Sequence, residues 1–154
     1  AFQYASPALQ ADKGVVREIV RRDWRAFEFA SKALRGDRVF IMEISKVCCE
    51  VLHFALPDVL ADYQVMSLAV EQDGCALRFA SEQLRADKEL VLAAVRKDWQ
   101  ALRFASEELR SDWEVVQAGI SQDDLALEFA IDDLREVRGP TLLKRPRQAG
   151  EATR

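Results

Sequence analysis

Apolar residues recur along the chain in two alternating patterns, and both patterns repeat every 25 residues. The first pattern places apolar side chains at i, i+1, i+4 and i+5, as over residues 15–20, which puts them on one narrow face of an α-helix. The second is the motif Ala-Leu/Phe-x-Phe-Ala, in which an aromatic ring always precedes a small residue. The rings are Tyr4, Phe29, Phe54, Phe79, Phe104 and Phe129. We therefore predict two short helices in each unit, with the rings packed in the core.

Polar residues at fixed places predict where these helices begin. An aspartate stands before the first pattern in every complete unit, as Asp12, Asp37, Asp62, Asp87 and Asp112. Aspartate accepts hydrogen bonds from the free N–H groups of a first helical turn, so we predict that each one is an N-cap. Further aspartates, at 23, 73, 98 and 123, mark the turn before the second helix. Serines at 6, 31, 81 and 106 follow it, and Pro7 directly after the first of them predicts a short last helical turn.

One such unit cannot bury its apolar side alone, so neighbouring units must stack. The sequence predicts an all-α fold, an α-solenoid of about five and a half helix-turn-helix repeats, each closed by a short helical turn. The units are 1–11 (partial), 12–36, 37–61, 62–86, 87–111 and 112–136. They form one array over 1–136, and a basic tail that we expect to be extended follows over 137–154.

The clearest unit, 87–111, combines Asp-Lys-Glu-x-Val-x-x-Ala-Val with Ala-Leu-x-Phe-Ala-Ser-Glu-Glu-Leu. This combination resembles a tandem helical-repeat family of unknown function whose members occur in protists, algae, some bacteria and large viruses. The resemblance covers about 1–136 and implies an interaction array; it brings no established activity and no catalytic residue. Where the family has Asn-Gly or Asp-Gly between the helices, Trp24, Trp99 and Asp124 replace the glycine here.

Composition and charge narrow the classes of function. The chain has 154 residues, of which 49 % are hydrophobic and 31 % are charged, as expected for a folded domain. Its net charge of −4 divides into +4 over 135–154 and −8 over 1–134. An acidic body disfavours nucleic-acid binding, which stays an alternative because some helical repeats read one base per unit. No apolar run approaches the roughly 20 residues that a membrane-spanning helix needs.

The cysteines Cys48, Cys49 and Cys75 are odd in number and two are adjacent, which is not a disulfide framework. Free thiols favour a reducing intracellular compartment, either the cytoplasm or an organelle interior. Cys49 and His53 stand four residues apart, so thiol-based chemistry at Cys48 or Cys49 is a further alternative. Metal-ligand spacings, glycine-rich phosphate loops and nucleophile motifs are absent from the sequence, so we expect no enzyme activity, cofactor or metal.

Two sets of residues are candidates for partner binding. Unit 37–61 departs most from the repeat, and we expect some of its apolar residues, together with the tryptophans, to face a partner. This first set is Trp24, Phe40, Met42, Cys48, Cys49, Trp99 and Trp113. Simple degeneracy of the repeat is the competing interpretation.

The second set is an arginine at one repeat position, with acidic residues two or three positions before it. It comprises Arg35, Arg85, Arg110 and Arg135. We expect stacking to align these residues into an exposed charged edge, which is either a recognition surface or a row of weak surface ion pairs.

The sequence thus predicts a non-enzymatic protein–protein interaction or scaffold module. The chain starts within a repeat, without a polar capping unit, and ends in a basic, proline-containing extension. Because repeat arrays need caps for solubility, we expect an accessory structural subunit of a larger assembly.

Overall fold

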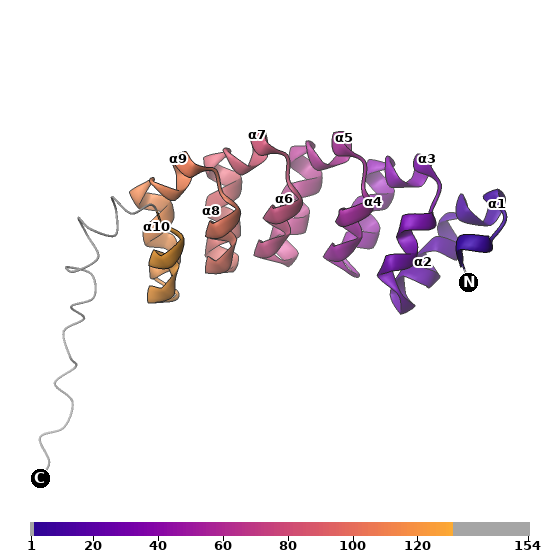
Figure 1. Ribbon diagram of the computed structural model, residues 1–154, viewed down its shortest axis with the longest axis horizontal. Helices are drawn as coiled ribbons and strands as arrows, with labels where there is room; N and C mark the ends of the chain where they lie inside the picture. Colours follow the sequence, from indigo (N-terminus) through magenta and orange to yellow (C-terminus); the bar gives the residue numbers. More distant parts are fainter. Residues whose placement is uncertain (1, 131–154) are drawn as a thin grey trace, which may run out of the picture.

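A computed structural model describes residues 2–130, and Figure 1 shows its units standing side by side in an elongated array. The four complete units over 12–111 each contain a long α-helix, a six-residue 3₁₀-helix and a four-residue α-helix, and the described part of unit 112–136 contains the first two. The long helices are α2 (Lys13–Arg22), α4 (Arg38–Ser45), α6 (Tyr63–Gln72), α8 (Lys88–Lys97) and α10 (Trp113–Ile120). The 3₁₀-helices are η2 (Trp24–Phe29), η3 (Cys49–Phe54), η4 (Gly74–Phe79), η5 (Trp99–Phe104) and η6 (Asp124–Phe129). No strand occurs within residues 2–130.

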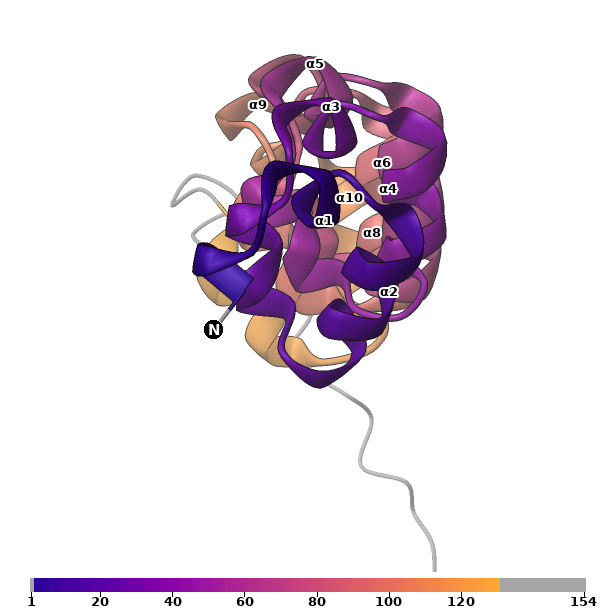
Figure 2. The same cartoon turned by 90° about the vertical axis from the view of Figure 1, so that its right-hand side faces the viewer.

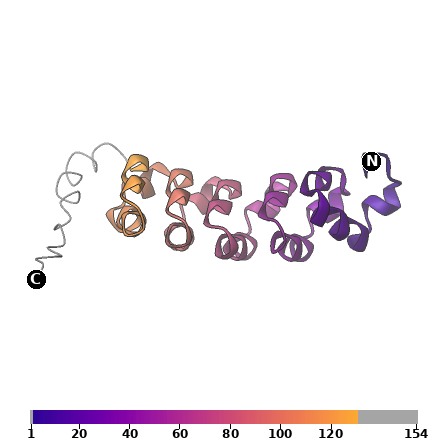
Figure 3. The ribbon, with the colours of Figure 1, turned by 90° about the horizontal axis from the view of Figure 1, so that it is seen from below.

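The long helices form one row and the 3₁₀-helices form a second row beside it, as the view from below in Figure 3 shows. The four-residue helices lie along one edge of the array, at the top of Figure 1. They are α1 (Pro7–Gln10), α3 (Lys32–Arg35), α5 (Pro57–Leu60), α7 (Glu82–Arg85) and α9 (Glu107–Arg110), and the chain begins with η1 (Phe2–Tyr4). Figure 2 looks along the array, and in this view the successive units lie largely behind one another. The predicted all-α solenoid is confirmed, and its second helix is a 3₁₀-helix.

The predicted caps are present. In each long helix one oxygen of the preceding aspartate accepts a backbone hydrogen bond; Asp12 accepts one from Val15 at 2.8 Å, and Asp87 one from Leu90 at 2.9 Å. A second set of aspartates caps the 3₁₀-helices, and the serines cap the four-residue helices. Unit 37–61 has Cys48 and Leu56 at these two places, and neither side chain makes a cap hydrogen bond.

The other oxygen of the same aspartates joins neighbouring units. Lys13 binds Asp37 at 2.6 Å, and Lys88 binds Asp112 at 2.8 Å. Arg38 makes the same contact to Asp62. Where a lysine or arginine follows the cap, as at Lys13, Arg38 and Lys88, it reaches the cap of the next unit, and that one carboxylate both starts a helix and holds two units together.

A ladder of backbone hydrogen bonds runs parallel to these ion pairs. The N–H group of Ser31 donates to the carbonyl of Gln10 at 2.9 Å, and that of Ser106 donates to Arg85 at 2.9 Å. The bonds from Leu56 to Arg35 and from Ser81 to Leu60 complete the set in the units between. The contact needs no particular side chain, so it survives in unit 37–61, where leucine replaces the serine.

The core lies between the two rows and continues through the units. Phe27, Leu52, Leu77 and Leu102 are fully buried on the 3₁₀-helices. The recurrent ring two residues later, which the sequence predicts to be core, packs only against the edge of the core in Phe54, Phe79, Phe104 and Phe129. Phe29 is 36 % exposed and Tyr4 is 83 % exposed, so these two rings depart from the prediction.

We predict that Asp112→Ala lowers stability more than Asp87→Ala. Both changes remove a cap, which typically costs about 0.5–2 kcal/mol. Only the first also removes a contact between units, because Tyr63 stands where a cation would reach Asp87, and Asp87 has no ion pair within the described residues. Urea unfolding of the two variants, followed by circular dichroism, measures the difference. Equal losses would show that the second oxygen contributes nothing to stacking.

We also predict that the loss of folding stability at acid pH depends on these carboxyl groups. Hydrogen bonds from Lys13 and Lys88 lower the pKa of Asp37 and Asp112 below the ordinary value of 3.8. A lowered folded-state pKa stabilises the fold above pH 3.8, and this contribution disappears as the pH falls through the folded-state pKa. The melting temperature should fall less steeply between about pH 5 and pH 2 in the double variant Asp37→Asn/Asp112→Asn, because asparagine keeps a cap oxygen but does not titrate. An unchanged slope would contradict this assignment.

Candidate functional site

An open groove crosses three units on the 3₁₀-helix side of the array. It has a volume of about 550 Å³ and is lined by Trp24, Glu50, His53, Arg78 and Phe79. The His53 ring stands edge-on to Phe79, with 6.4 Å between the ring centroids. Arg78 lies over the Phe79 ring, 4.6 Å from its centroid, and pairs with Glu50. We call this the aromatic groove; it joins apolar rings, a cation and an anion at one exposed place.

The arrangement of an arginine over a ring recurs in the next unit. Arg103 lies over Phe104 at 4.7 Å, as Arg78 lies over Phe79. His53 holds the same repeat position and is exposed like the two arginines, as expected from the sequence. We call His53, Arg78 and Arg103 the cationic strip. The sequence shows that this repeat position is polar. It does not show that the two arginines lie over the rings that follow them.

The two predicted tryptophans of the turns join neighbouring units. Trp24 packs against Phe54 with ring centroids 5.8 Å apart, and Trp99 stacks on Phe129 at 5.7 Å. Both side chains are half-buried, because each packs against the neighbouring unit on one side only. Trp24 also lines the aromatic groove. Trp113, the third candidate, is half-buried at the start of α10 in the other row.

The tightness of the unit contacts is clearest at Gly74, the one glycine left in these turns. A Cβ atom built at Gly74 would lie 2.5 Å from the carbonyl oxygen of Ala94, which belongs to the next unit. Trp24 and Trp99 hold the same repeat position in their own units.

The candidates in unit 37–61 divide between core and surface. Phe40 is 1 % exposed, so the expectation that it faces a partner is wrong: its place on the buried face of α4 puts it in the core. Met42 is half-buried and lines a shallow groove between α4 and α6 with Tyr63. Cys48 and Cys49 are half-buried against the core. Val39, 74 % exposed, is the most exposed large apolar residue of this unit, and Val47 follows at 51 %.

The predicted charged edge differs from the expectation. Arg35, Arg85 and Arg110 are half-buried, and the Nε atom of each is buried without an acceptor. Within the described part of this edge one ion pair forms, between Arg110 and Glu107 of the same unit at 4.0 Å. The predicted network between units is therefore absent from the described part of this edge, and the ion pairs that join units are made elsewhere, at the aspartate caps, between Arg17 and Glu43, and between Arg78 and Glu50. Arg135 and the tail over 137–154 lie outside the described residues.

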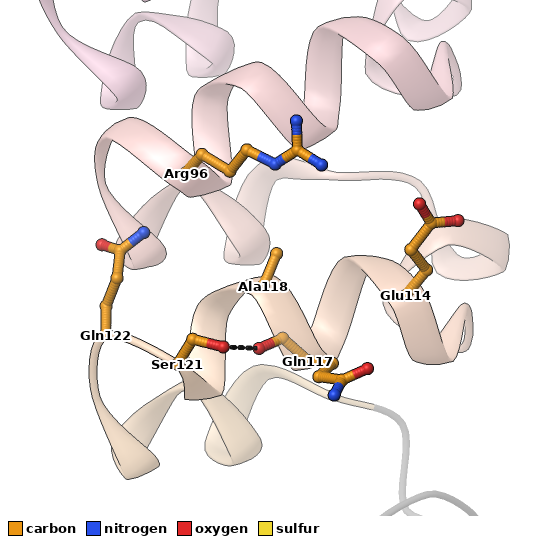
Figure 4. Close-up of a pocket in the computed structure, with 6 residues that line it drawn as sticks. All are labelled: Arg96, Glu114, Gln117, Ala118, Ser121 and Gln122. Carbon is orange, nitrogen blue, oxygen red and sulfur yellow. Dashed lines mark hydrogen bonds between the residues drawn. The ribbon is translucent and has the colours of Figure 1, made fainter.

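A second groove lies between α8 and α10 (Figure 4). It has a volume of about 410 Å³, with Arg96 on the α8 side and Gln117 and Gln122 on the other side. Gln122 accepts a hydrogen bond from the N–H group of Trp99 at 3.1 Å and donates one to the carbonyl of Val95. Its amide is therefore already used to join two units.

The surroundings of Cys49 and Cys75 raise the pKa of both thiols. Burial, with a smaller effect from the charge of Asp73, raises the pKa of Cys49 to about 11. Burial and a hydrogen bond to Asp98 at 3.2 Å raise the pKa of Cys75 to about 12. Cys49 donates to the carbonyl of Ser45 at 3.6 Å, and its neighbour His53 turns its ring to phenylalanines. These raised pKa values disfavour a thiol nucleophile.

The described residues contain one set of side chains of the kinds that ligate metals. The ligand atoms of Asp73, Cys75 and Asp98 lie within 4.8 Å of one another. Asp73 and Asp98 each cap a 3₁₀-helix, and Asp98 also accepts the Cys75 thiol hydrogen bond. The cluster therefore has a complete structural explanation as two caps and a thiol donor.

The comparisons with known proteins agree with the repeat architecture. Residues 1–35, 37–85 and 87–135 each match the family described as "Domain of unknown function (DUF4116)". The chain belongs to this family. Each of the two longer matches spans nearly two of the 25-residue units. No match was found among curated proteins or solved structures. No helix within residues 2–130 is long and apolar enough to cross a membrane.

We predict that Cys75 reacts at neutral pH at least about tenfold more slowly than free cysteine with an aromatic disulfide reagent, because its thiolate is scarce. The measurement uses a Cys48→Ser/Cys49→Ser background, so that Cys75 is the one thiol left. Asp98→Asn should speed the reaction, because it removes the negative charge that opposes ionisation. Asp123→Asn is the matched control, since that cap has Leu125 in place of a cysteine. A Cys75 as reactive as free cysteine would contradict the raised pKa.

Proposed function

We propose that this protein is a non-enzymatic protein-interaction module that binds a segment of another protein along its row of 3₁₀-helices. The observation that carries this proposal is the aromatic groove, which collects Trp24, His53, Arg78 and Phe79 from three successive units at an exposed surface. Tryptophan and arginine are the residues most often found at the energetic centres of protein interfaces.

The architecture supports binding along a surface. A solenoid presents equivalent positions of successive units in a row, so a ligand can contact several units at once. The groove needs three units to form, and the core beneath it is continuous, so its walls are held in place before a partner arrives. Such preorganisation reduces the entropy that binding costs.

Other classes of function have less support. The raised pKa values of Cys49 and Cys75 oppose nucleophilic catalysis. The net charge of −8 over 1–134 opposes the close approach of a nucleic-acid backbone. An accessory or scaffold role in a larger assembly is the setting that we propose for the module, because an array of this kind offers binding surface and no reactive centre.

The test is affinity purification from the native source, with bound partners quantified by mass spectrometry. A hot-spot tryptophan is worth about 2 kcal/mol or more, so Trp24→Ala should reduce partner recovery by more than about tenfold. Trp113→Ala, a half-buried tryptophan of the other row, is the matched control and should retain the partner. Circular dichroism of both variants checks that they fold. A chain that retains no partner, or equal losses in the two variants, would refute the proposal.

A further inference from the structure

The charge of one surface position changes along the array. In the five complete units the residue just before the recurrent ring is acidic in the first and last, as Glu28 and Glu128, and is His53, Arg78 or Arg103 in the three units between. All five side chains are exposed. The cationic strip is therefore a bounded surface of three units within an acidic body, and it suits a ligand of limited length.

The two arginines of the strip are held flat by the rings beneath them. The guanidinium groups lie 4.6 Å and 4.7 Å from the ring centroids of Phe79 and Phe104. Stacking restrains the guanidinium plane while its N–H edge can still bind a carboxylate through two hydrogen bonds. Within the described residues Arg103 has no ion pair, and Arg78 has one, with Glu50. Both arginines keep donors for a further acceptor.

The general spacing of packed helices points to one conformation of a ligand. Arg78 and Arg103 belong to neighbouring units, and packed helices lie about 8–10 Å apart. A polyproline II segment has three residues per turn and rises about 3.1 Å per residue, so every third side chain recurs on one face after about 9.3 Å. In a β-strand, residues three apart point to opposite faces. Carboxylates at every third residue of a polyproline II segment therefore match the two arginines.

We propose that the cationic strip binds an acidic polyproline II segment of a partner protein, with successive carboxylates three residues apart on Arg78 and Arg103. This inference rests on the proposed function and names the chemistry of the partner. An apolar or aromatic side chain of the segment enters the aromatic groove beside Trp24. Glu50 is an internal competitor, because its carboxylate already occupies donors of Arg78.

A single-stranded nucleic acid is the other polyanion that stacked arginines can hold. The structure favours the peptide. A nucleic acid carries charge at every nucleotide and meets Glu50, Glu28 and Glu128 as well as the arginines, whereas a peptide can place its carboxylates only on the strip.

The test is fluorescence anisotropy of labelled synthetic peptides with the full chain. A peptide of five Glu-Pro-Pro repeats is compared with one of identical composition whose glutamates are clustered at one end. The spaced peptide should bind at least about tenfold more tightly, because only it can satisfy both arginines. Equal affinities would mean unspecific charge attraction and would overturn the inference, as would tighter binding of a labelled oligouridine.

Variants locate the site. Arg103→Ala and Arg78→Ala should each weaken the spaced peptide by about tenfold, and Arg103→Lys should restore only part of that loss, because an ammonium group cannot bind in the bidentate mode. Arg96→Ala, which removes an exposed arginine from α8 in the other row, is the matched control and should bind like the unchanged chain. The assignment would be overturned if Arg96→Ala weakened peptide binding as much as Arg103→Ala does.

The peptide affinity of Glu50→Gln distinguishes a binding role of Arg78 from a purely structural one. Removing the competing carboxylate should tighten peptide binding by about threefold. Unchanged or weaker binding would show that Arg78 does not hold a peptide carboxylate. If every peptide fails while a purified partner still depends on Trp24, the acidic ligand is refuted and the interaction function stands. If no partner depends on Trp24, the proposed function itself fails.

Discussion

The stacking of the units depends on the aspartate that begins a long helix, because at Asp37, Asp62 and Asp112 its carboxylate serves two units at once. One oxygen accepts a backbone hydrogen bond from its own helix, and the other meets a cation of the preceding unit. Local helix formation and the stacking of units are thereby joined through a single side chain. An isolated unit would have neither the cation nor the facing half of its core, so the units are stable only in a row.

This constraint also explains why the array tolerates a degenerate unit. Unit 37–61 lacks two of its caps, because cysteine and leucine replace aspartate and serine. It keeps the cap at Asp37, the ion pair to Lys13 and the backbone bond from Leu56 to Arg35. It also buries Phe40, Ile41 and Ile44 completely. The contacts between units are retained, while two of the three side-chain caps within the unit are lost. Stacking therefore matters more to this unit than those two caps.

The aromatic groove and the cationic strip both lie on the row of 3₁₀-helices. A six-residue 3₁₀-helix is too short and too tightly wound to bury all its apolar side chains, and its last ring falls at the edge of the core. That half-buried ring supports the preceding arginine in η4 and η5. The geometry that completes each unit therefore also exposes the two stacked arginines, and the surface that we propose for binding forms without any loop inserted into the repeat.

The sequence by itself determined the all-α class, the 25-residue unit and the caps, because a cap and a helical stripe are made by residues within a few positions of each other. Part of the candidate site was also accessible in this way: Trp24 and the exposure of His53, Arg78 and Arg103 follow from their repeat positions. Only the tertiary structure decided that Phe40 is core, that the arginine edge forms no network between its described units, and that the ion pairs run through the caps. These outcomes depend on which side chains of one unit meet those of the next, and that is set by the spacing and rotation of the stacked units, which no single repeat encodes.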